Sequence, residues 1–308
     1  MGQMIQEQPG TIFMQPWWLD AVAPGEWGQV QVMNGDTVAA RMPYRYTRKF
    51  GMKMLTMPPL TQHLGPWFNL PDDAKYSTQL SRQHELCNAL LNQLPPFDFF
   101  RQRFSTRVTN WLPFYWQQYN QSTQYTYVIP DITDPEVVWS GFNDTARRQV
   151  RKAQKQLDIT EAGIEEFYNI NNLTFERQGM KNPYSLSLMK RLDAACKERD
   201  TAKIFKASDS KGNTHAVLYL VWDTDTAYYL MGGGDPELRS SGAASLLMWE
   251  AIRFASNRVS QFDFEGSMVQ GIERFFRTFG AVQTPYFRIT KVNNRLLQFV
   301  NQLIPVLR

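Results

Sequence analysis

The sequence predicts an α+β fold with a mixed, mostly antiparallel sheet flanked by helices. Its second half supports this through the order of its expected elements: helices at 164–178 and 185–199, strands at 202–207, 216–222 and 227–231, then a helix, a strand and a helix up to 280. Short polar turns between the strands favour antiparallel neighbours. The first half repeats this order more loosely, which indicates two related domains.

Composition narrows the class of protein. The chain has 308 residues, which favours two domains or one large one, and its 43% hydrophobic and 14% aromatic residues exclude a disordered chain. A net charge of +4 suits an anionic ligand without requiring nucleic acid. Cys87 and Cys196 lack metal-ligand spacing and the three histidines are scattered, so we expect no metal site and a cytoplasmic protein with reduced thiols.

We expect neither a signal peptide nor a membrane span. The first ten residues have no basic segment followed by an apolar one, and no run of about 18 apolar residues occurs. The tail from 293 to 308 has an apolar stripe on one helical side. We expect this helix to pack back on the protein, with peripheral membrane contact as the alternative.

Each element of the first half has its own signal. Asn34-Gly35 between two short apolar runs predicts a hairpin. The loop at 58–68 is apolar, so it either folds over a cleft or simply packs. The other expected elements are a helix at 17–22, a strand at 44–55, a helix at 81–94, a strand at 97–104, an aromatic turn at 111–116 and a strand at 124–130.

A domain boundary is expected within 131–144, where turn and cap residues gather. Asn143 or Asp144 can cap the next helix. This helix carries five cations within nine positions, which form either a solvated face or a contact with an anionic substrate. They are Arg147, Arg148, Arg151, Lys152 and Lys155.

The most informative stretch runs from 226 to 280. A strand ends in Gly232-Gly233-Gly234, and a second group of small residues then opens the helix that continues to Ala255. Glycines ahead of a helix let backbone amides approach a phosphate, and the helix N-terminus adds partial positive charge. The stretch therefore predicts a site for the pyrophosphate of an acyl carrier.

In this context the pattern Arg239-x-x-Gly242-x-Ala244 resembles the GNAT acyltransferase superfamily. The resemblance implies that backbone amides of this loop bind the pyrophosphate of acyl-coenzyme A. The residues expected to bind this co-substrate are Arg239, Ser240, Ser241, Gly242, Ala243 and Ala244.

Four further segments narrow the resemblance to the branch that contains the Fem-type peptidoglycan bridge ligases and related bacterial acyltransferases. They are 147–153, 228–233, 262–267 and 271–280. Proteins of this branch carry two GNAT-like domains in one chain. The resemblance therefore implies an N-terminal GNAT-like domain at 1–135, an acyltransferase domain at 136–290 and a C-terminal helix at 291–308.

Acyl transfer to an amine needs a proton acceptor for the amine. The alternation of a strand places Asp263 and Glu265 on one face, so either could be this base. Alternatively, they cap the next helix or pair with Arg274 or Arg277.

Many GNAT enzymes use a tyrosine on the following helix as the acid for the leaving thiolate. Here the matching positions are Phe275 and Phe276, which cannot donate a proton. Tyr228, Tyr229 and Tyr286 are the possible replacements. Tyr229 is the expected catalytic residue among them, and Tyr228 is an expected substrate contact.

Together these features predict an acyl-CoA-dependent N-acyltransferase whose acceptor is an amine of a small molecule, amino sugar, lipid or cell-envelope precursor. The cationic residues Arg147, Arg148 and Arg151 are its expected substrate contacts. One alternative is a Fem-type ligase that uses aminoacyl-tRNA, although the sequence shows no sustained heptad for a coiled-coil arm. Another is a non-catalytic binding protein on the GNAT fold. No DNA partner is expected.

Overall fold

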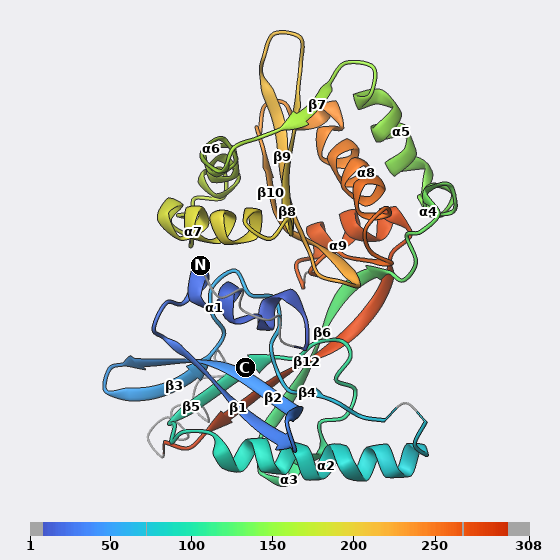
Figure 1. The fold of residues 1–308 in the computed structure, drawn as a ribbon. Helices are drawn as coiled ribbons and strands as arrows, with labels where there is room; N and C mark the ends of the chain where they lie inside the picture. The colour runs from blue at the N-terminus through green and yellow to red at the C-terminus, as the bar shows by residue number, and fades with distance from the viewer. Residues whose placement is uncertain (1–8, 72, 267, 295–308) are drawn as a thin grey trace. The chain divides into compact units, whose positions relative to one another are not determined.

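The computed structural model describes residues 9–294 except 72 and 267, and the chain forms two compact units (Figure 1). Unit 1 combines the residues up to Gln124 with those from Pro285 onward, and unit 2 spans Tyr125–Thr284. These bounds differ from the expected division after 135 and 290. Two strands run across the unit boundaries, β6 (Asn120–Ile129) and β12 (Val282–Val292). Residues 295–308, which hold most of the expected C-terminal helix, lie outside the described residues.

Unit 1 is a mixed sheet with strand order β1-β2-β3-β5-β12, and β4 pairs with β2. The pairs are antiparallel except for β3 with β5. Its other elements are η1 (Ile12–Met14), α1 (Pro16–Val22), β1 (Trp27–Asn34), β2 (Thr37–Lys49), β3 (Met52–Thr56), β4 (Trp67–Phe68), α2 (Tyr76–Gln93), β5 (Phe99–Arg103) and α3 (Leu112–Trp116).

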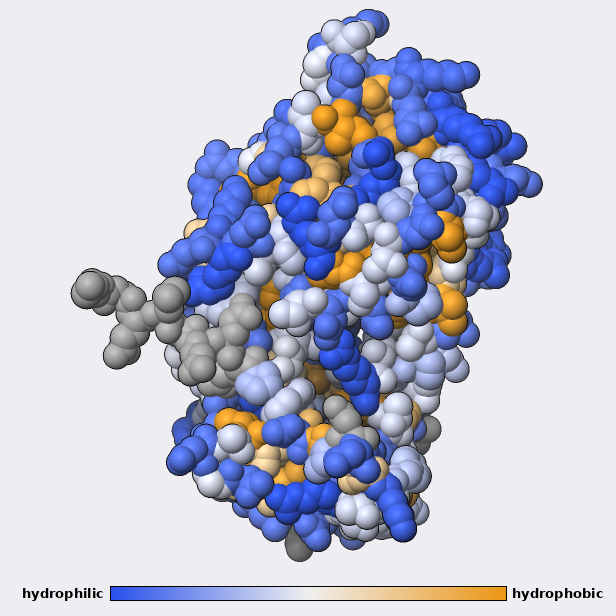
Figure 2. All heavy atoms as spheres, turned by 45° about the vertical axis from the view of Figure 1, so that its right-hand side comes forward, coloured by the Kyte–Doolittle hydropathy of each residue, from blue (hydrophilic) through white to orange (hydrophobic). Residues whose placement is uncertain are grey.

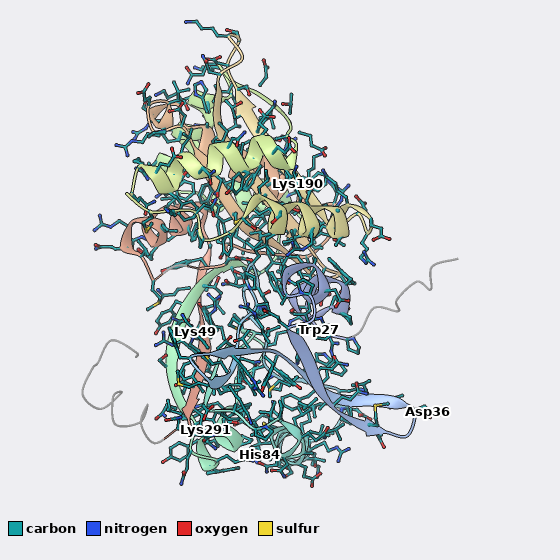
Figure 3. The ribbon with its side chains drawn as sticks, turned by 90° about the vertical axis from the view of Figure 1, so that its left-hand side faces the viewer. Trp27, Asp36, Lys49, His84, Lys190 and Lys291 are labelled. Atoms are coloured by element: carbon teal, nitrogen blue, oxygen red, sulfur yellow. The ribbon has the colours of Figure 1, made fainter. Side chains whose placement is uncertain are left out.

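The core of unit 1 lies between this sheet and α2 and α3, which cover one of its faces (Figure 1). Phe100 and Ile289 come from the sheet and Leu90 from α2, and all three are fully buried. The predicted β1–β2 hairpin is confirmed: Asn34 pairs with Thr37, and Asp36 marks its tip in Figure 3.

Unit 2 contains strands in the order β6-β11-β10-β9-β8-β7, and among its described strand pairs only β10 with β11 is parallel. Its elements besides β6 are α4 (Pro135–Gly141), α5 (Asp144–Ala153), β7 (Asp158–Glu161), α6 (Ile164–Glu176), α7 (Leu186–Lys197), β8 (Ala202–Ser208), β9 (Thr214–Trp222), β10 (Thr226–Gly234), η2 (Arg239–Ser241), α8 (Ala243–Ala255), β11 (Gln261–Asp263), α9 (Gln270–Phe276) and η3 (Arg277–Phe279). The expected α+β class is confirmed.

Helices cover both faces of the unit 2 sheet. In Figure 1, α6 and α7 lie on one face, and α5 and α8 lie on the other. The helix α8 is buried along most of its length because its apolar run, which includes Leu246, Leu247 and Ile252, packs on the sheet. Asn143 caps α5 as predicted, since its side chain accepts a hydrogen bond from the Ala146 amide.

The structure corrects several expected elements of the first half. The single strand expected at 44–55 is the end of β2 and all of β3, because Phe50 and Gly51 both adopt positive φ and turn the chain. The aromatic turn at 111–116 is the helix α3, with Pro113 in its first turn. The boundary segment 131–144 contains the helix α4, whose first amides are capped by Asp134.

Gly232, Gly233 and Gly234 belong to β10 instead of forming a loop. At each of these three positions, a side chain would collide with a neighbouring group. A Cβ on Gly233 would lie 2.6 Å from the Asn171 Cα, and one on Gly234 would lie 2.9 Å from the His215 carbonyl oxygen. The glycines therefore allow α6 to pack directly on the end of β10.

The surface holds small separate apolar areas between hydrophilic side chains on the face shown in Figure 2. Exposed apolar residues occur in short groups, such as Leu112, Tyr115 and Trp116 on α3. Across residues 9–294, leaving out 72 and 267, no helix combines the length and the apolarity needed to span a membrane.

Gly233→Ala tests the close packing of α6 on β10. The added methyl would meet the Asn171 backbone, so we expect the free energy of unfolding to fall by about 1–3 kcal/mol. The matched control is Gly271→Ala in α9, where an added Cβ meets no atom within 4 Å and the helix should gain stability. Urea denaturation measures both variants. Equal stability of Gly233→Ala and the natural protein would contradict this account.

Candidate functional site

The site begins where β10 and β11 part. They pair over three positions only, from Thr226 with Gln261 to Tyr228 with Asp263. The strand β10 then continues to Gly234, paired with β9 alone among the described strands, and its register shifts between Tyr229 and Met231. The two strands therefore diverge beyond Asp263, at the end of the sheet that leads into η2 and α8.

Side chains of α6 fix the end of β10. The Asn171 side-chain amide donates to the Gly232 carbonyl at 2.8 Å, and the Gly234 amide donates to the Thr174 hydroxyl at 3.3 Å. Asn171 is 3% exposed, and its oxygen accepts a hydrogen bond from the Asn182 side chain. This buried polar network holds the backbone of β10 at the point where the chain enters the loop.

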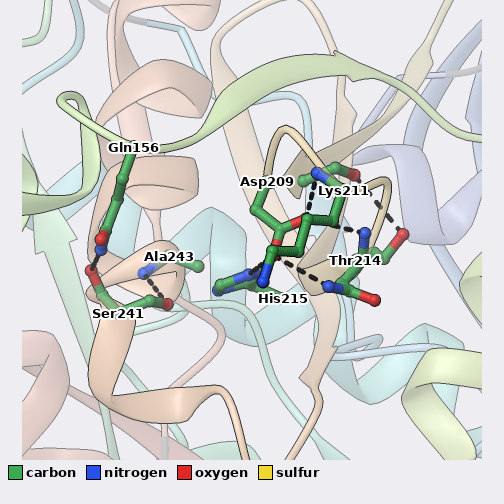
Figure 4. A network of polar contacts seen from close by, with 9 residues as sticks. Gln156, Asp209, Lys211, Thr214, His215, Ser241 and Ala243 are labelled. Carbon is green, nitrogen blue, oxygen red and sulfur yellow. Dashed lines mark hydrogen bonds and ion pairs between the residues drawn. The ribbon is translucent and has the colours of Figure 1, made fainter.

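The loop before α8 is held from outside by α5 and the residues after it. The Lys152 ammonium donates to the Ser240 carbonyl at 2.7 Å, and the Gln156 side chain donates to the Ser241 carbonyl at 3.2 Å, as Figure 4 shows for Gln156. Gly242 has φ +87°, and a Cβ there would lie 2.5 Å from the Gln149 carbonyl oxygen. Glycine is therefore required for both the conformation and the contact.

These contacts leave amides of the α8 N-terminus available to a ligand. The Ala243 amide donates to the Ser241 hydroxyl and the Leu246 amide to the Gly242 carbonyl. The amides of Gly242, Ala244 and Ser245 have no acceptor within the described chain. Together with the partial positive charge of a thirteen-residue helix, they fit an anionic group such as a phosphate.

The six loop residues predicted from the sequence to bind the co-substrate all lie at this loop and the α8 N-terminus. The five cations in and after α5 differ in what they contact. Arg147 donates hydrogen bonds to the Asp144 carboxylate and the Ser140 carbonyl, so its contacts lie at the N-terminal end of α5. Arg151 lies over the Trp139 ring, and Arg148 is exposed. Of the five cations, Lys152 is the one that an observed hydrogen bond connects to the loop.

Asp263 is the buried acid of the site. It is 6% exposed, and burial raises the pKa of its carboxyl to about 6, although hydrogen bonds from the Thr126 hydroxyl and the Glu265 amide oppose the shift. The Thr126 hydroxyl and the Glu265 amide both donate to its Oδ1. A carboxyl with a pKa near neutrality is suited to accept a proton.

Glu265 lies in a tight corner after Asp263. The strand β11 ends at Asp263, so the alternation expected across Asp263 and Glu265 does not apply. Glu265 has φ +57° and Gly266 φ +58°; a Cβ on Gly266 would lie 2.4 Å from the Tyr125 carbonyl oxygen. A non-glycine residue with positive φ stores strain, which the Asp263 hydrogen bond helps to hold.

Tyr229 lies close to this corner. Burial, followed by the negative charge of Glu265, raises the pKa of the Tyr229 phenol, so its hydroxyl stays protonated at neutral pH. A Cβ on Gly232 would lie 2.2 Å from the Tyr229 hydroxyl oxygen, so this oxygen lies against the β10 backbone. The ring also contacts Phe276 of α9.

Two other tyrosines lie elsewhere. The hydroxyl of Tyr228 bonds Asp223 at the β9–β10 turn, and Tyr286 is buried in unit 1. The Tyr228 hydroxyl therefore lies at this turn and not with the loop before α8. Four site residues were not found from the sequence: Thr126, Gln156, Asn171 and Thr174. Each acts through a contact with a distant segment, which no local pattern indicates.

Among the described residues, no group of three or more histidine, cysteine, aspartate or glutamate side chains could hold a metal ion. The carboxylate of Asp209 has a structural role in the β8–β9 turn. It accepts hydrogen bonds from the Lys211 and Asn213 amides and contacts His215 (Figure 4).

Comparison with solved structures finds the same fold over nearly the whole chain. FemX aligns at 12% identity with a TM-score of 0.68, covering 97% of this chain and 96% of its own. L-PGS from Bacillus licheniformis aligns at 9% identity and a TM-score of 0.55, covering 92% and 88%. A tandem GNAT protein from the clavulanic acid biosynthesis pathway aligns at 9% and 0.52, covering 89% and 86%.

No curated protein matches the sequence. A family model described as an acetyltransferase (GNAT) domain matches residues 140–277, which include the α8 loop, the Asp263 corner and Tyr229. This segment is therefore similar to acetyltransferase (GNAT) domains, and the chain has a fold similar to those of FemX and the tandem GNAT protein.

Proposed function

We propose that the protein is an N-acyltransferase that takes an acyl group from acyl-CoA and transfers it to an amine. The main support for this proposal comes from the α8 N-terminus. The amides of Gly242, Ala244 and Ser245 have no acceptor there within the described chain. Because Lys152 and Gln156 bond the loop carbonyls, the backbone there is held in place before a ligand arrives. Such preorganisation favours binding of a pyrophosphate.

In this proposal, residues at the point where β10 and β11 part supply the proton transfers. An acyl-CoA thioester supplies the activated acyl group. In the proposal Asp263, with a pKa near 6, accepts the proton that the attacking amine must lose. Glu265 attracts the ammonium form of the acceptor. Tyr229, which stays protonated, is the acid that donates a proton to the departing sulfur.

The acceptor is proposed to be an amine of a small molecule, amino sugar, lipid or cell-envelope precursor in the bacterial cytoplasm. A second candidate is a Fem-type ligase with aminoacyl-tRNA as donor. The exposed cations Arg148, Arg151 and Lys155 favour it, since they could contact a polyanion. So does the alignment with FemX along nearly the whole chain.

Direct binding separates the donors. Calorimetry with acetyl-CoA and a longer acyl-CoA should give saturable binding under the first proposal. Absence of binding at millimolar concentration, together with salt-dependent binding of charged tRNA, would replace the first proposal with the second. Binding of coenzyme A without transfer to any amine would instead favour a non-catalytic binding protein.

Ala244→Glu tests the anion site. Ala244 is exposed at the α8 N-terminus, where a glutamate should stabilise the helix but repel a pyrophosphate. We expect at least tenfold weaker binding of acetyl-CoA, with an unchanged or higher melting temperature. Thr145→Glu makes the same charge change at an exposed position in the first turn of α5 and should bind normally. Unchanged affinity in Ala244→Glu would remove the loop as the pyrophosphate site.

Asp263→Asn tests the proposed base through activity. Its oxygen can still accept the hydrogen bonds of Thr126 and Glu265, so the corner should keep its geometry. The natural enzyme should gain rate as pH rises through about 6, because the base must be unprotonated. The variant should lose roughly 10²–10⁴-fold in kcat. Full activity would leave Asp263 a positioning role, and Glu265→Gln would then be examined as the base.

The same variant has an expected effect on stability. The pKa of Asp263 is raised on folding from 3.8 to about 6, so the folded protein binds the extra proton. The free energy of unfolding of the natural protein should therefore fall, relative to Asp263→Asn, as pH rises from about 4 to about 6. The difference should reach at most about 3 kcal/mol above that range. Parallel urea titrations at several pH values measure it; equal pH dependence would contradict the raised pKa.

A further inference from the structure

The turn between β2 and β3 carries an aromatic side chain at its tip. Lys49 pairs with Met52, so Phe50 and Gly51 form the turn by themselves. Their φ angles are +51° and +76°, which is the combination of a two-residue type I′ turn. Phe50 is 88% exposed, more than any other large apolar residue of the described chain. The hairpin extends to the left of unit 1 in Figure 1.

Phenylalanine at this position is unfavourable for the fold in two ways. Type I′ turns favour Asn-Gly because both central residues need positive φ, and a bulky residue is strained there. The exposed ring also gains no stabilisation from burial. Backbone strain of this kind is commonly retained at positions that contact a ligand or a partner. The tip therefore indicates a contact with a surface outside the described chain.

Three cations surround this ring. The Lys49 ammonium lies 5.6 Å from the centroid of the Phe50 ring, and Lys49 is labelled in Figure 3. Arg48 is directly opposite Lys53, and like charges in this arrangement destabilise a hairpin. Strand alternation places Arg48 and Lys53 on one face of the hairpin and Lys49 on the other. Positive charge therefore lies on both sides of the tip.

No carboxylate neutralises these cations. In the described part of the chain, the three side chains form no ion pair. By contrast, Arg45 on the same strand β2 pairs with Glu26 at 2.6 Å. The Asp98 carboxylate lies next to β3, but it accepts a hydrogen bond from the Lys53 backbone amide at 2.8 Å. The tip therefore presents an apolar ring within uncompensated positive charge, and its complement is an anionic surface.

We propose that the β2–β3 hairpin docks the protein on the surface of an anionic lipid bilayer. The Phe50 ring enters the boundary between headgroups and acyl chains, and the three cations contact the lipid phosphates around it. Headgroups surround an inserted side chain on all sides, which suits cations on both faces of the hairpin. A nucleic-acid strand would instead follow one face. This inference does not depend on the proposed acyl transfer.

Cosedimentation of the full-length protein with vesicles tests this surface. We expect binding to vesicles of phosphatidylcholine with phosphatidylglycerol, and release as salt rises, because salt screens the cations. Phe50→Asn should weaken this binding about tenfold, since the apolar anchor is lost. Its melting temperature should stay equal or rise, because Asn-Gly suits the turn. The matched control is Tyr76→Asn: Tyr76 is 78% exposed beside Lys75 at the start of α2, and this variant should bind normally.

A fluorescent label shows whether the tip itself enters the bilayer. Cys87 and Cys196 are the two cysteines of the chain, and both are buried. A Phe50→Cys variant can therefore be labelled at the tip with a dye whose emission depends on polarity. We expect the emission to shift to the blue on phosphatidylglycerol vesicles. The same label on Tyr76→Cys should not shift.

The proposal is overturned if the natural protein does not bind the anionic vesicles, or if Phe50→Asn binds them equally well. An equal loss in Tyr76→Asn, or an unshifted label at position 50, would also overturn it. Binding of single-stranded RNA that depends on Phe50, without binding to vesicles, would assign the tip to nucleic acid instead. None of these measurements involves coenzyme A or an amine, so failure here is distinct from failure of the donor site.

Discussion

The packing of α5 against the loop before α8 is the contact on which the proposed donor site depends. Gly242 lies too close to the Gln149 carbonyl for any side chain to fit. Lys152 and Gln156 donate hydrogen bonds to the carbonyls of Ser240 and Ser241, respectively. A peptide carbonyl that is bonded on one side directs the following amide to the other side. The Gln156 contact with the Ser241 carbonyl thus orients the Gly242 amide, which has no acceptor within the described chain.

The acid corner depends on the divergence of β10 and β11. Because β11 ends at Asp263, the chain turns sharply, and Glu265 takes a conformation that costs of order 1–3 kcal/mol for a residue with a side chain. Gly266 then packs on the β6 backbone, where only glycine fits. The strain and the buried charge of Asp263 both act against stability. Their coincidence beside Tyr229 is typical of residues held in place for chemistry.

Local sequence patterns predicted many of the helices, strands and turns, but they did not predict which residues form the candidate site. The hairpin at Asn34, the α5 cap at Asn143 and the apolar run of α8 follow from neighbouring residues, and all were predictable. The prediction that Gly232–Gly234 form a loop was wrong. Glycine is required at these positions because Tyr229, α6 and β9 lie too close for a side chain, and not because the chain turns there. Asn171 and Thr126 act across 61 and 137 residues of sequence, so only the folded chain reveals them.

Charge constrains the proposed donor site. At the α8 N-terminus, the amides of Gly242, Ala244 and Ser245 have no acceptor within the described chain. A fold selected for stability alone would satisfy these amides with one acidic side chain, as the Asp134 side chain does for the first amides of α4. Proteins commonly keep such costs where a ligand supplies the missing charge. An enzyme that binds a pyrophosphate carrier at these amides would gain stability from that substrate.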